Sequence, residues 1–438
     1  MMVTRCRFLD PGTRFAFDCQ PQIAARAAVR VAVAAEQEVA MTRPFTMRFL
    51  GLLLAGSLAV VGCGGEDEVT VPAPTATLTP TPTPTPTPAA TAFLIPVLPD
   101  APLLDRVNFA GAVSADGRVV VGVSASASGN QAFRWTVDGE LQALGMLPEY
   151  TGSSQAFAVS ADGSVVVGES LKQDGTTGRA FVWTAESGIQ PLGELPDWVT
   201  SSQASGVSAD GLTVVGVAVG HDPNYVGEKT LCFYWTAEEG FHLFGDFLPA
   251  AAVGTQCRAY GISGNGQVVV GEARYDIVNL QPALEGFRFT RDTGLVPLGF
   301  VDPQNPQSSA ACASATGGVI GGLSFTTQGD LTFGSPMRWS TTVGPTWLLY
   351  GGLGETRAVS ADGTHMAGGA ADGGTAFVWD VDNGYRNLYG LLMESGLDQG
   401  LEGHSPISVY GMSGDGHVVV GSAIDGRGNV RAFSVRLP

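Results

Sequence analysis

Gln155 to Leu195 reads Q-A-F-A-V-S-A-D-G-S-V-V-V-G, then a variable loop, then R-A-F-V-W-T and G-I-Q-P-L-G-E-L, and versions of this stretch recur until the chain ends. The serine that opens S-A-D-G repeats at intervals of about 46 to 55 residues. Each serine is followed by an apolar run ending in glycine and then, in most copies, by an aromatic pair at alternate positions. The seven serines are Ser114, Ser160, Ser208, Ser263, Ser314, Ser360 and Ser413.

Each repeat predicts four short strands, because runs of β-branched and aromatic residues alternate with Asp-Gly, Asn-Gly and other glycine-containing turns. Four strands in a period of about 40 to 50 residues are typical of a propeller blade. The seventh repeat stops at Leu437 and Pro438 after its third strand, and Phe93 to Leu98 is an apolar stretch ahead of the first repeat. We therefore expect an all-β fold: a seven-bladed β-propeller of four-stranded blades, its ring closed by the N-terminal strand pairing with the last blade.

The first 63 residues are expected to be processed or absent in the mature protein. Residues 1–40 show no repeat, and we interpret them as a misassigned upstream start. In residues 41–63, Arg43 and Arg48 precede thirteen mostly apolar residues, which suit a signal peptide and are too few for a membrane-spanning helix of about 20. The segment ends in V-V-G-C at Cys63, which is similar to the lipobox of bacterial lipoproteins. That resemblance implies a diacylglycerol thioether on Cys63; the alternative is an ordinary secretory signal with a chance cysteine.

Residues 64–92 are expected to be a linker between this anchor and the propeller domain, residues 93–438. The linker is first acidic and then alternates threonine and proline from Thr79 to Pro88, which favours an extended polyproline rod; a disordered spacer would serve the same purpose. Gly64 after the cysteine is compatible with export to the outer membrane in the lipoprotein family. We therefore expect a lipid-anchored protein at the bacterial outer membrane or cell surface, with its domain extracellular or periplasmic.

The charge of the chain limits its possible partners, and its cysteines indicate a disulfide and no metal site. The chain has 23 Lys+Arg against 41 Asp+Glu, a net charge of −18, which argues against nucleic acid as a partner. Of the cysteines outside the N-terminal region, Cys232 and Cys257 lie in neighbouring elements and are the preferred disulfide pair, which leaves Cys312 over. With no Cys-x-x-Cys motif and no Cys/His cluster, we expect no metal site and no cofactor.

No residue is assigned a catalytic role. S-A-D-G recurs in most repeats, so its aspartate is interpreted as a hairpin-turn residue, since Asp, Asn and Gly tolerate the backbone angles of tight turns. The alternating aromatic pairs, such as Phe181 and Trp183, are expected to fill the space between blades. The sequence has no G-x-S-x-G, H-E-x-x-H or P-loop motif. Carboxylates are plentiful, but no pair is singled out.

Variation between repeats is concentrated in the second-to-third and fourth-to-first strand connections, which lie on one face of a propeller. The long segments are 171–178, 220–230, 273–285, 324–335 and 391–409. Such diverse loops on a rigid scaffold usually carry binding, and they hold aromatics beside acids, a combination that can stack on a sugar ring and accept its hydroxyl hydrogen bonds. The candidate ligand-binding residues are Tyr150, Trp198, Tyr225, Tyr275, Asp197, Asp222 and Asp276.

The A-F-x-W-T, L-G-x-L and V-S-A-D-G-x-V-V-V-G elements together resemble the HAF-repeat family of bacterial exported proteins over residues 93–438. The histidine for which that family is named is replaced by Gln131, Arg179, Thr375 and Arg431 in four repeats. The resemblance implies an extracellular or surface propeller and implies no activity.

Three functions follow from these patterns. The preferred one is a lipid-anchored surface module that binds carbohydrate or an envelope protein. The alternatives are a surface polysaccharide hydrolase or lyase, which should show a deep acidic pocket at the channel mouth, and a structural envelope protein.

Overall fold

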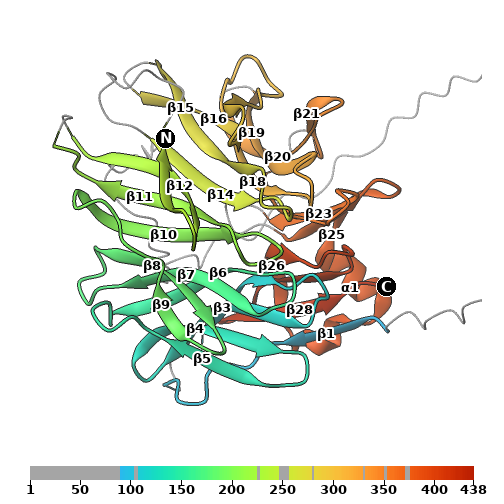
Figure 1. Ribbon diagram of the computed structural model, residues 1–438. Helices are drawn as coiled ribbons and strands as arrows, with labels where there is room; N and C mark the ends of the chain where they lie inside the picture. Colours follow the sequence, from blue (N-terminus) through green and yellow to red (C-terminus); the bar gives the residue numbers. More distant parts are fainter. Residues whose placement is uncertain are drawn as a thin grey trace, which may run out of the picture. The chain divides into compact units, whose positions relative to one another are not determined.

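The computed structural model describes residues 89–102, 107–223, 227–245, 256–278, 281–328, 331–349, 353–369 and 375–438. These residues form seven four-stranded antiparallel sheets, arranged around a common centre (Figure 1). The inner strand of each sheet contacts the inner strands of its two neighbours, and the last contacts the first. The chain is therefore a seven-bladed β-propeller, as the repeat predicts.

The blades follow one another along the chain, with the first strand of each repeat innermost. Blades 1 to 3 are β2–β5 (Asn108–Val113, Val119–Ser126, Gly129–Thr136, Leu141–Gly145), β6–β9 (Ser153–Val159, Val165–Leu171, Gly178–Thr184, Gly188–Pro191) and β10–β13 (Val199–Val207, Val214–Gly220, Lys229–Thr236, Gly240–Phe244). Blades 4 and 5 are β14–β17 (Cys257–Ile262, Val269–Val278, Gln281–Thr290, Gly294–Pro297) and β18–β21 (Ser308–Ala313, Val319–Gln328, Leu331–Ser340, Gly344–Trp347). Blade 6 is β22–β25 (Glu355–Val359, His365–Gly369, Phe377–Asp380, Gly384–Asn387), and blade 7 joins β26–β28 (Ser405–Met412, Val418–Ile424, Val430–Arg436) to β1 (Thr91–Leu94).

The N-terminal strand closes the ring, as expected. β1 pairs antiparallel with β28, from Thr91 opposite Arg436 to Leu94 opposite Phe433, and the two lie side by side in Figure 1. The strand predicted at Phe93 to Leu98 is placed too far toward the C-terminus, since the observed strand is Thr91–Leu94. Ile95, which is fully buried, still donates its N–H to the Ala432 carbonyl of β28 at 2.8 Å, and pairing ends there because Pro96 has no N–H for a sheet hydrogen bond.

The hydrophobic core is divided among the blade interfaces. Six clusters of buried side chains each combine residues of two neighbouring blades. The first member of the repeated aromatic pair, such as Phe181, is fully buried in six blades, and Met337 takes its place in blade 5. The aromatic pairs therefore fill the space between blades, as the alternation predicts.

The glycine that ends each apolar run is required by this packing. In blade 2 Gly168 lies directly opposite Phe181 across the strand pair. A Cβ on Gly168 would come within 1.9 Å of the Gln155 carbonyl oxygen and 2.8 Å of the Phe181 ring. The same Gly-aromatic (or Gly-Met) pairing occurs in every blade. The V-V-V-G element thus keeps a space for the aromatic ring.

The S-A-D-G elements are the hairpin turns that the sequence predicts. In blade 2 the Ser160 hydroxyl donates to Asp162 Oδ1 at 2.6 Å and accepts from the Val165 backbone N–H at 3.0 Å. The same Asp162 oxygen accepts from the Ser164 N–H at 3.0 Å, and Gly163 has φ 75°, a conformation that favours glycine. We call the side of the ring that carries these turns the S-A-D-G face.

Backbone hydrogen bonds join the seven turns into a closed ring around the channel mouth. In each blade a turn residue donates its N–H to the carbonyl of the matching turn in the next blade, and the seventh turn returns to the first. The bonds run Ala115 to Ala161, Ala161 to Ala209, Ala209 to Gly264, Asn265 to Ala315, Ala315 to Ala361, Ala361 to Gly414 and Gly414 to Ala115, at 2.9 to 3.0 Å. Main-chain hydrogen bonds therefore hold this face together, regardless of which side chains the turns carry.

Acid should weaken the turns. Hydrogen bonds from serine and from the backbone hold the pKa of Asp162 and of Asp362 down to about 2, against 3.8 for a free aspartate. Because the folded pKa is the lower one, this stabilisation is complete above pH of about 4 and is lost as the pH falls toward 2. We expect Asp162→Asn/Asp362→Asn to flatten the loss of stability over that interval, since Asn265 already fills this place in blade 4. Urea unfolding at pH 6 and pH 3 measures it; an unchanged pH slope would contradict the assignment.

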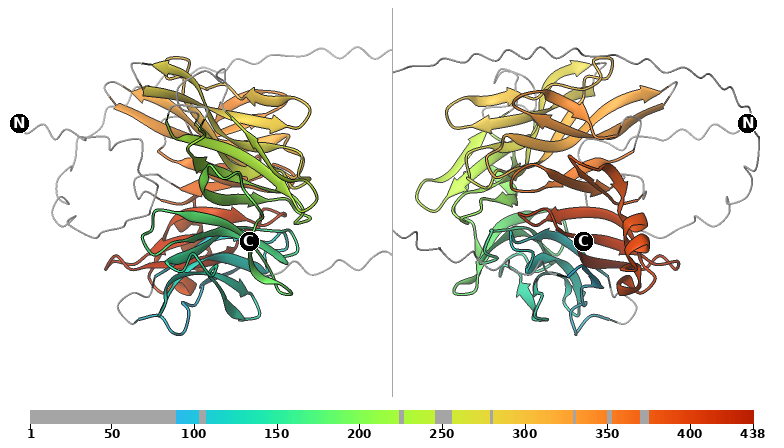
Figure 2. Two further views of the ribbon diagram at one scale, coloured as in Figure 1. Left: turned by 60° about the vertical axis from the view of Figure 1, so that its left-hand side comes forward. Right: turned by 90° about the vertical axis from the view of Figure 1, so that its right-hand side faces the viewer.

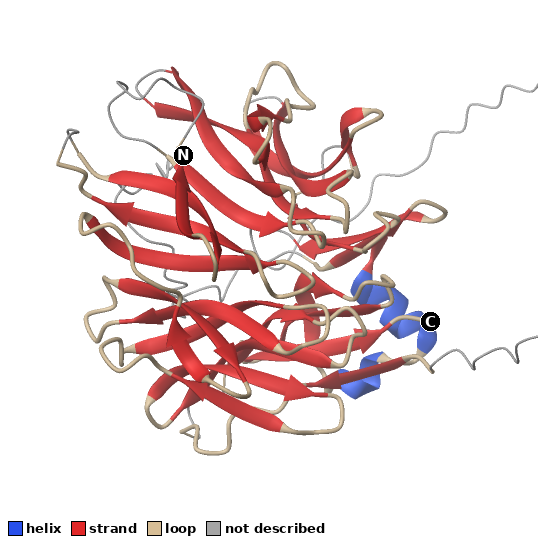
Figure 3. Ribbon diagram, in the orientation of Figure 1, coloured by secondary structure: helices blue, strands red, loops and turns tan. Residues whose placement is uncertain are grey.

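The opposite side of the ring, which we call the variable-loop face, is built partly of strands and helical turns where the sequence predicts loops. Segments 273–285 and 324–335 are largely strand, because β15–β16 and β19–β20 continue pairing out to Val278 opposite Gln281 and Gln328 opposite Leu331. Segment 391–409 contains most of α1 (Leu388–Ser395) and all of η1 (Asp398–Leu401). Figure 3 shows these helical turns in blue against the strands.

The helical insertion also supports ring closure. Leu388, Leu392 and Leu401 are fully buried in the cluster between blades 6 and 7, where the β1 residues Ala92 and Leu94 pack against them. The insertion lies at the outer edge of the ring (Figure 2). Within the described part of the chain, no helix is long and apolar enough to cross a membrane.

A disulfide links two neighbouring blades. Cys232 on β12 and Cys257 on β14 are bonded, with their Cα atoms 5.2 Å apart, and both are fully buried in the cluster between blades 3 and 4. Cys312 is the free cysteine among the described residues. The bond therefore reinforces the packing between blades 3 and 4.

Candidate functional site

Trp198 is the best-placed candidate on the variable-loop face. It directly precedes β10 and is partly exposed, and its neighbour Asp197 is exposed. The Trp198 carbonyl accepts a hydrogen bond from the His221 N–H at 3.0 Å, so the loop before β10 is held against the loop after β11. Within the described residues, the indole takes part in no ring contact or hydrogen bond. The residue is therefore partly accessible to a ligand.

Tyr150, at the equivalent position of blade 2, is placed differently. It packs against the hydrophobic cluster between blades 1 and 2, and the Lys172 Nζ lies 5.4 Å from its ring centroid. A ring covered in this way by the protein is a poorer stacking platform. Tyr150 therefore supports the edge of the blade rather than matching Trp198.

The acidic candidates are also divided. Asp222 accepts a hydrogen bond from Lys229 Nζ at 3.0 Å in a pair whose side chains are only 10 to 14% exposed, so its carboxylate is engaged within the blade. Tyr225 lies outside the described residues, as does Cys63. Tyr275 and Asp276 belong to β15, but their side chains are not described. Trp198 and Asp197 are therefore neighbours only by sequence, and the remaining candidates lie apart from them or are not described.

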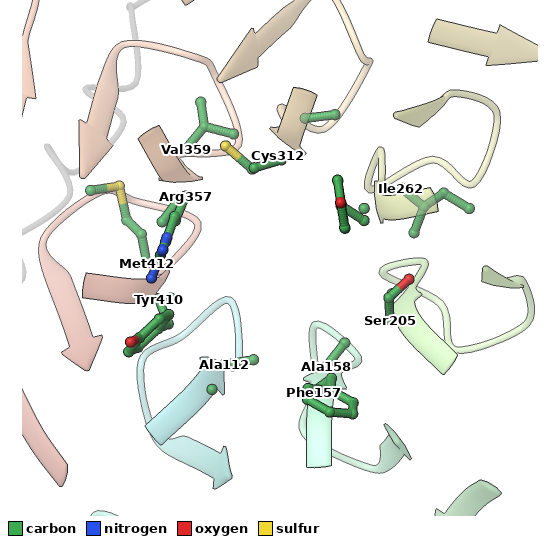
Figure 4. A pocket seen from close by; sticks show the side chains of 18 of the residues that line it. Ala112, Phe157, Ala158, Ser205, Ile262, Cys312, Arg357, Val359, Tyr410 and Met412 are labelled. Atoms are coloured by element: carbon green, nitrogen blue, oxygen red, sulfur yellow. The ribbon is translucent and has the colours of Figure 1, made fainter. Parts of the chain in front are cut away.

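The central channel contains a cavity of about 240 Å³ that the sequence analysis did not anticipate. Its walls are the last three residues before the serine in six inner strands, and Phe157 and Ala158 in blade 2, so it lies toward the S-A-D-G face. Figure 4 shows the lining side chains from all around the ring, among them Phe157, Cys312, Arg357 and Tyr410. No Asp or Glu occurs among the lining residues. The cavity is therefore not the acidic pocket expected of a glycoside hydrolase.

A β-bulge at one repeated position shapes this cavity. In every blade the pairing of the first two strands shifts register three residues before the serine, and bulges of this kind re-aim a side chain. Four blades carry Gly, Phe, Ser or Ala there, whereas blades 4, 6 and 7 carry larger polar residues. The seven residues are Gly111, Phe157, Ser205, Tyr260, Ala311, Arg357 and Tyr410, and all of them line the cavity.

Arg357 is fixed in the channel wall by three neighbours. Its Nε donates to Glu355 Oε2 at 3.1 Å, and its Nη1 donates to Ser408 Oγ at 3.2 Å. The guanidinium carbon lies 4.9 Å from the centroid of the Tyr410 ring, in the range of a cation–π contact. Among the described residues, neither Nη2 of Arg357 nor the Tyr410 hydroxyl has a hydrogen-bond partner. Both groups can therefore serve a ligand.

On blade 4, a second buried polar group backs the cavity. The Tyr260 hydroxyl donates to Glu272 Oε1 at 2.8 Å, and Arg258 Nη1 lies 3.5 Å from the same oxygen. Burial raises the pKa of Tyr260 and that of Glu272. Burial likewise raises the pKa of the cavity-lining Cys312 to about 12. At neutral pH Tyr260 and Cys312 are therefore protonated, and Cys312 is a poor nucleophile.

The channel residues carried a signal in the sequence. Position three before the serine is small or apolar in most repeats, so Tyr260, Arg357 and Tyr410 stand out once the repeats are aligned. Perturbed ionisable groups in a cavity are candidates for function. No group of three or more His, Cys, Asp or Glu side chains among the described residues could hold a metal ion.

These features define a seven-bladed propeller with a partly exposed aromatic on one face and a polar cavity in its channel. No family model matches the sequence, and no curated protein matches it. Solved propeller structures do match in fold. An oligogalacturonate lyase from Vibrio parahaemolyticus aligns with TM-score 0.50 and 10% identity over 80% of this chain and 97% of its own.

Two further solved structures are similar over most of the propeller. An oligogalacturonate lyase in complex with manganese gives TM-score 0.48 and 11% identity over 76% of this chain and 90% of its own. TolB from Acinetobacter baumannii gives TM-score 0.42 and 12% identity over 63% of this chain, and the match spans 64% of TolB. At these identities the comparisons establish the fold alone.

Proposed function

We propose that this chain is a lipid-anchored surface module that binds carbohydrate through its variable-loop face. The observation that carries the proposal is the position of Trp198: a partly exposed aromatic residue that follows the exposed Asp197 in the chain, on the variable-loop face. An aromatic platform beside an acceptor is the chemistry that sugars require, since the ring covers their C–H face and the carboxylate accepts from hydroxyls.

The difference between the two faces supports placing the binding site on the variable-loop face. The S-A-D-G face is joined by a closed ring of main-chain hydrogen bonds, whereas the variable-loop face carries connections of different length and form. A rigid ring that displays diverse loops is the usual arrangement of a binding scaffold. The channel cavity has no carboxylate in its lining, which favours a binding module over the hydrolase or lyase alternative.

The location rests on Cys63. If the cysteine at the end of the V-V-G-C sequence is lipidated, the Thr-Pro segment from Thr79 to Pro88 holds the propeller away from the membrane. We expect the wild-type chain in the membrane fraction with lipid on Cys63, and we expect Cys63→Ser to carry no lipid, as measured by mass spectrometry of the N-terminal segment. Recovery of both chains from the soluble fraction would exclude the anchor.

Trp198→Ala tests the binding face. We expect the detergent-solubilised full chain to bind a subset of a broad glycan array, and Trp198→Ala to weaken that binding about tenfold or more, because buried tryptophans contribute most to such interfaces. Leu212→Ala is the matched control: Leu212 lies on the S-A-D-G turn of the same blade and is 67% exposed. Equal binding by wild type and Trp198→Ala, or an array with no hit, would overturn the proposal.

A further inference from the structure

The channel cavity offers hydrogen-bond donors that the fold itself does not use. Arg357 lines the cavity with Nε and Nη1 engaged by Glu355 and Ser408 and with Nη2 free among the described residues. Tyr410 stacks on the same guanidinium and also lines the cavity. A guanidinium N–H beside a phenol O–H is a pair of donors suited to one carboxylate.

The orientation of these donors is fixed before any ligand arrives. Glu355 and Ser408 hold two of the three guanidinium nitrogens, and the Tyr410 ring covers one face of the group. A long arginine side chain otherwise loses conformational freedom when it binds, and that cost is avoided here. The Glu355 carboxylate also balances the charge of Arg357, so the empty cavity needs no counterion.

The remainder of the cavity wall is apolar or already satisfied. Phe157, Ile262 and Met412 contribute apolar side chains, and the Ser205 hydroxyl is occupied by the Ala259 carbonyl at 2.6 Å. Tyr260 lies in blade 4, across the ring from blade 7, and its hydroxyl donates its hydrogen bond to Glu272. A volume of about 240 Å³ accommodates one group of amino-acid size and not a chain of sugars.

The rim of the cavity carries the opposite charge to the arginine. The S-A-D-G turns surround the mouth and bear exposed carboxylates in five blades. In two of these blades, hydrogen bonds hold the pKa of Asp162 and of Asp362 down to about 2. This field disfavours ligands with two or more negative charges and favours a positive group near the mouth. The five carboxylates are Asp116, Asp162, Asp210, Asp362 and Asp415.

We infer that the channel binds a small zwitterion, an amino acid with an apolar side chain, through Arg357 and Tyr410. The ligand carboxylate accepts from Arg357 Nη2 and from the Tyr410 hydroxyl, its apolar side chain lies among Phe157, Ile262 and Met412, and its ammonium group faces the rim carboxylates. This site lies toward the S-A-D-G face and is separate from the proposed glycan site at Trp198. Either site can therefore fail its test without affecting the other.

Titration calorimetry on the full chain in detergent, at low ionic strength, tests this site with L-leucine as the probe. Leucinamide lacks the carboxylate and 4-methylpentanoate lacks the ammonium group, so each removes one proposed contact. We expect L-leucine to bind, leucinamide to bind at least about a hundredfold more weakly, and 4-methylpentanoate about tenfold more weakly. No binding of L-leucine, or equal binding of all three, would overturn the inference.

Two variants locate the site. Tyr410→Phe removes a single hydroxyl while keeping the ring against Arg357, and should weaken L-leucine binding about tenfold without unfolding the chain. Arg357→Gln should abolish binding. Because this change also removes the partner of Glu355, thermal unfolding of the variant is recorded to show that it is still folded. Tyr389→Phe, a matched change on α1 outside the channel, should leave binding unchanged. If Tyr410→Phe binds L-leucine as tightly as Tyr389→Phe does, the assignment is wrong.

Discussion

Phe181→Ala is expected to lower the free energy of unfolding by about 3 to 5 kcal/mol, the usual cost of deleting a buried phenylalanine ring. Phe181 is fully buried between blades 1 and 2 and lies over Gly168, whose missing side chain leaves room for the ring. Neighbouring atoms cannot fill the space, because both strands are held by the sheet. Urea unfolding of the full chain, followed by circular dichroism, measures the loss.

The chain supplies its own control for this prediction. Blade 5 carries Met337 where the other blades carry phenylalanine, and Met337 is also fully buried. Phe181→Met should therefore cost less than about 1.5 kcal/mol, since methionine adapts to the same space. If Phe181→Met and Phe181→Ala are equally destabilising, the site depends on the shape of the ring and the interpretation of the repeat position is wrong.

Asn108→Ala is expected to lower the free energy of unfolding by about 3 kcal/mol, because it removes the Asn108 hydrogen bonds of the Pro96 carbonyl and the Ala432 N–H. The Ile95 carbonyl keeps a hydrogen bond from Arg431 Nη2 at 3.0 Å. The Asn108 amide donates to the carbonyls of Ile95 and Pro96 at 3.1 and 3.0 Å, and its oxygen accepts from the Ala432 N–H at 2.9 Å. The side chain is fully buried. It therefore ties blade 1 to blade 7 and to the segment that follows the closing strand.

Ser154→Ala is the matched control for ring closure. Ser154 holds the same position in blade 2, where it accepts from the Ala132 N–H at 2.9 Å and donates to the Gly145 carbonyl at 2.6 Å. Its loss affects one junction within the chain and should cost about 1 kcal/mol. Thermal and urea unfolding of both variants compare them; an Asn108→Ala variant no less stable than Ser154→Ala would contradict a special role for Asn108.

The fold could be predicted because the same four-strand pattern occurs seven times in the sequence. Period, turn residues and alternating aromatics each agree with a four-stranded blade, and the missing strand of the last blade indicated closure by the N-terminus. The bounds of that strand were harder to predict, since the apolar run from Phe93 to Leu98 does not show that pairing with β28 stops at Ile95. Long hairpins such as β15–β16 were also missed, because their variable tips resemble loops.

The site was harder to predict for two physical reasons. Whether an aromatic on a loop is free or packed depends on contacts between loops, so Tyr150 and Trp198 look equivalent in sequence and differ in the structure. The channel residues Arg357 and Tyr410 lie at β-bulges, which decide the direction of their side chains and have no clear mark in the sequence. Aligning the repeats shows that they are unusual, but not that they share a cavity.

Hydrogen exchange of the full chain, with and without its strongest array glycan, tests most directly where that ligand binds. The account predicts slower exchange in the loop that precedes β10 around Trp198 and in the loop that follows β11 from His221, with the S-A-D-G turns unchanged. Slower exchange confined to the S-A-D-G turns and the inner strands would place the glycan in the channel and contradict the assignment of the variable-loop face.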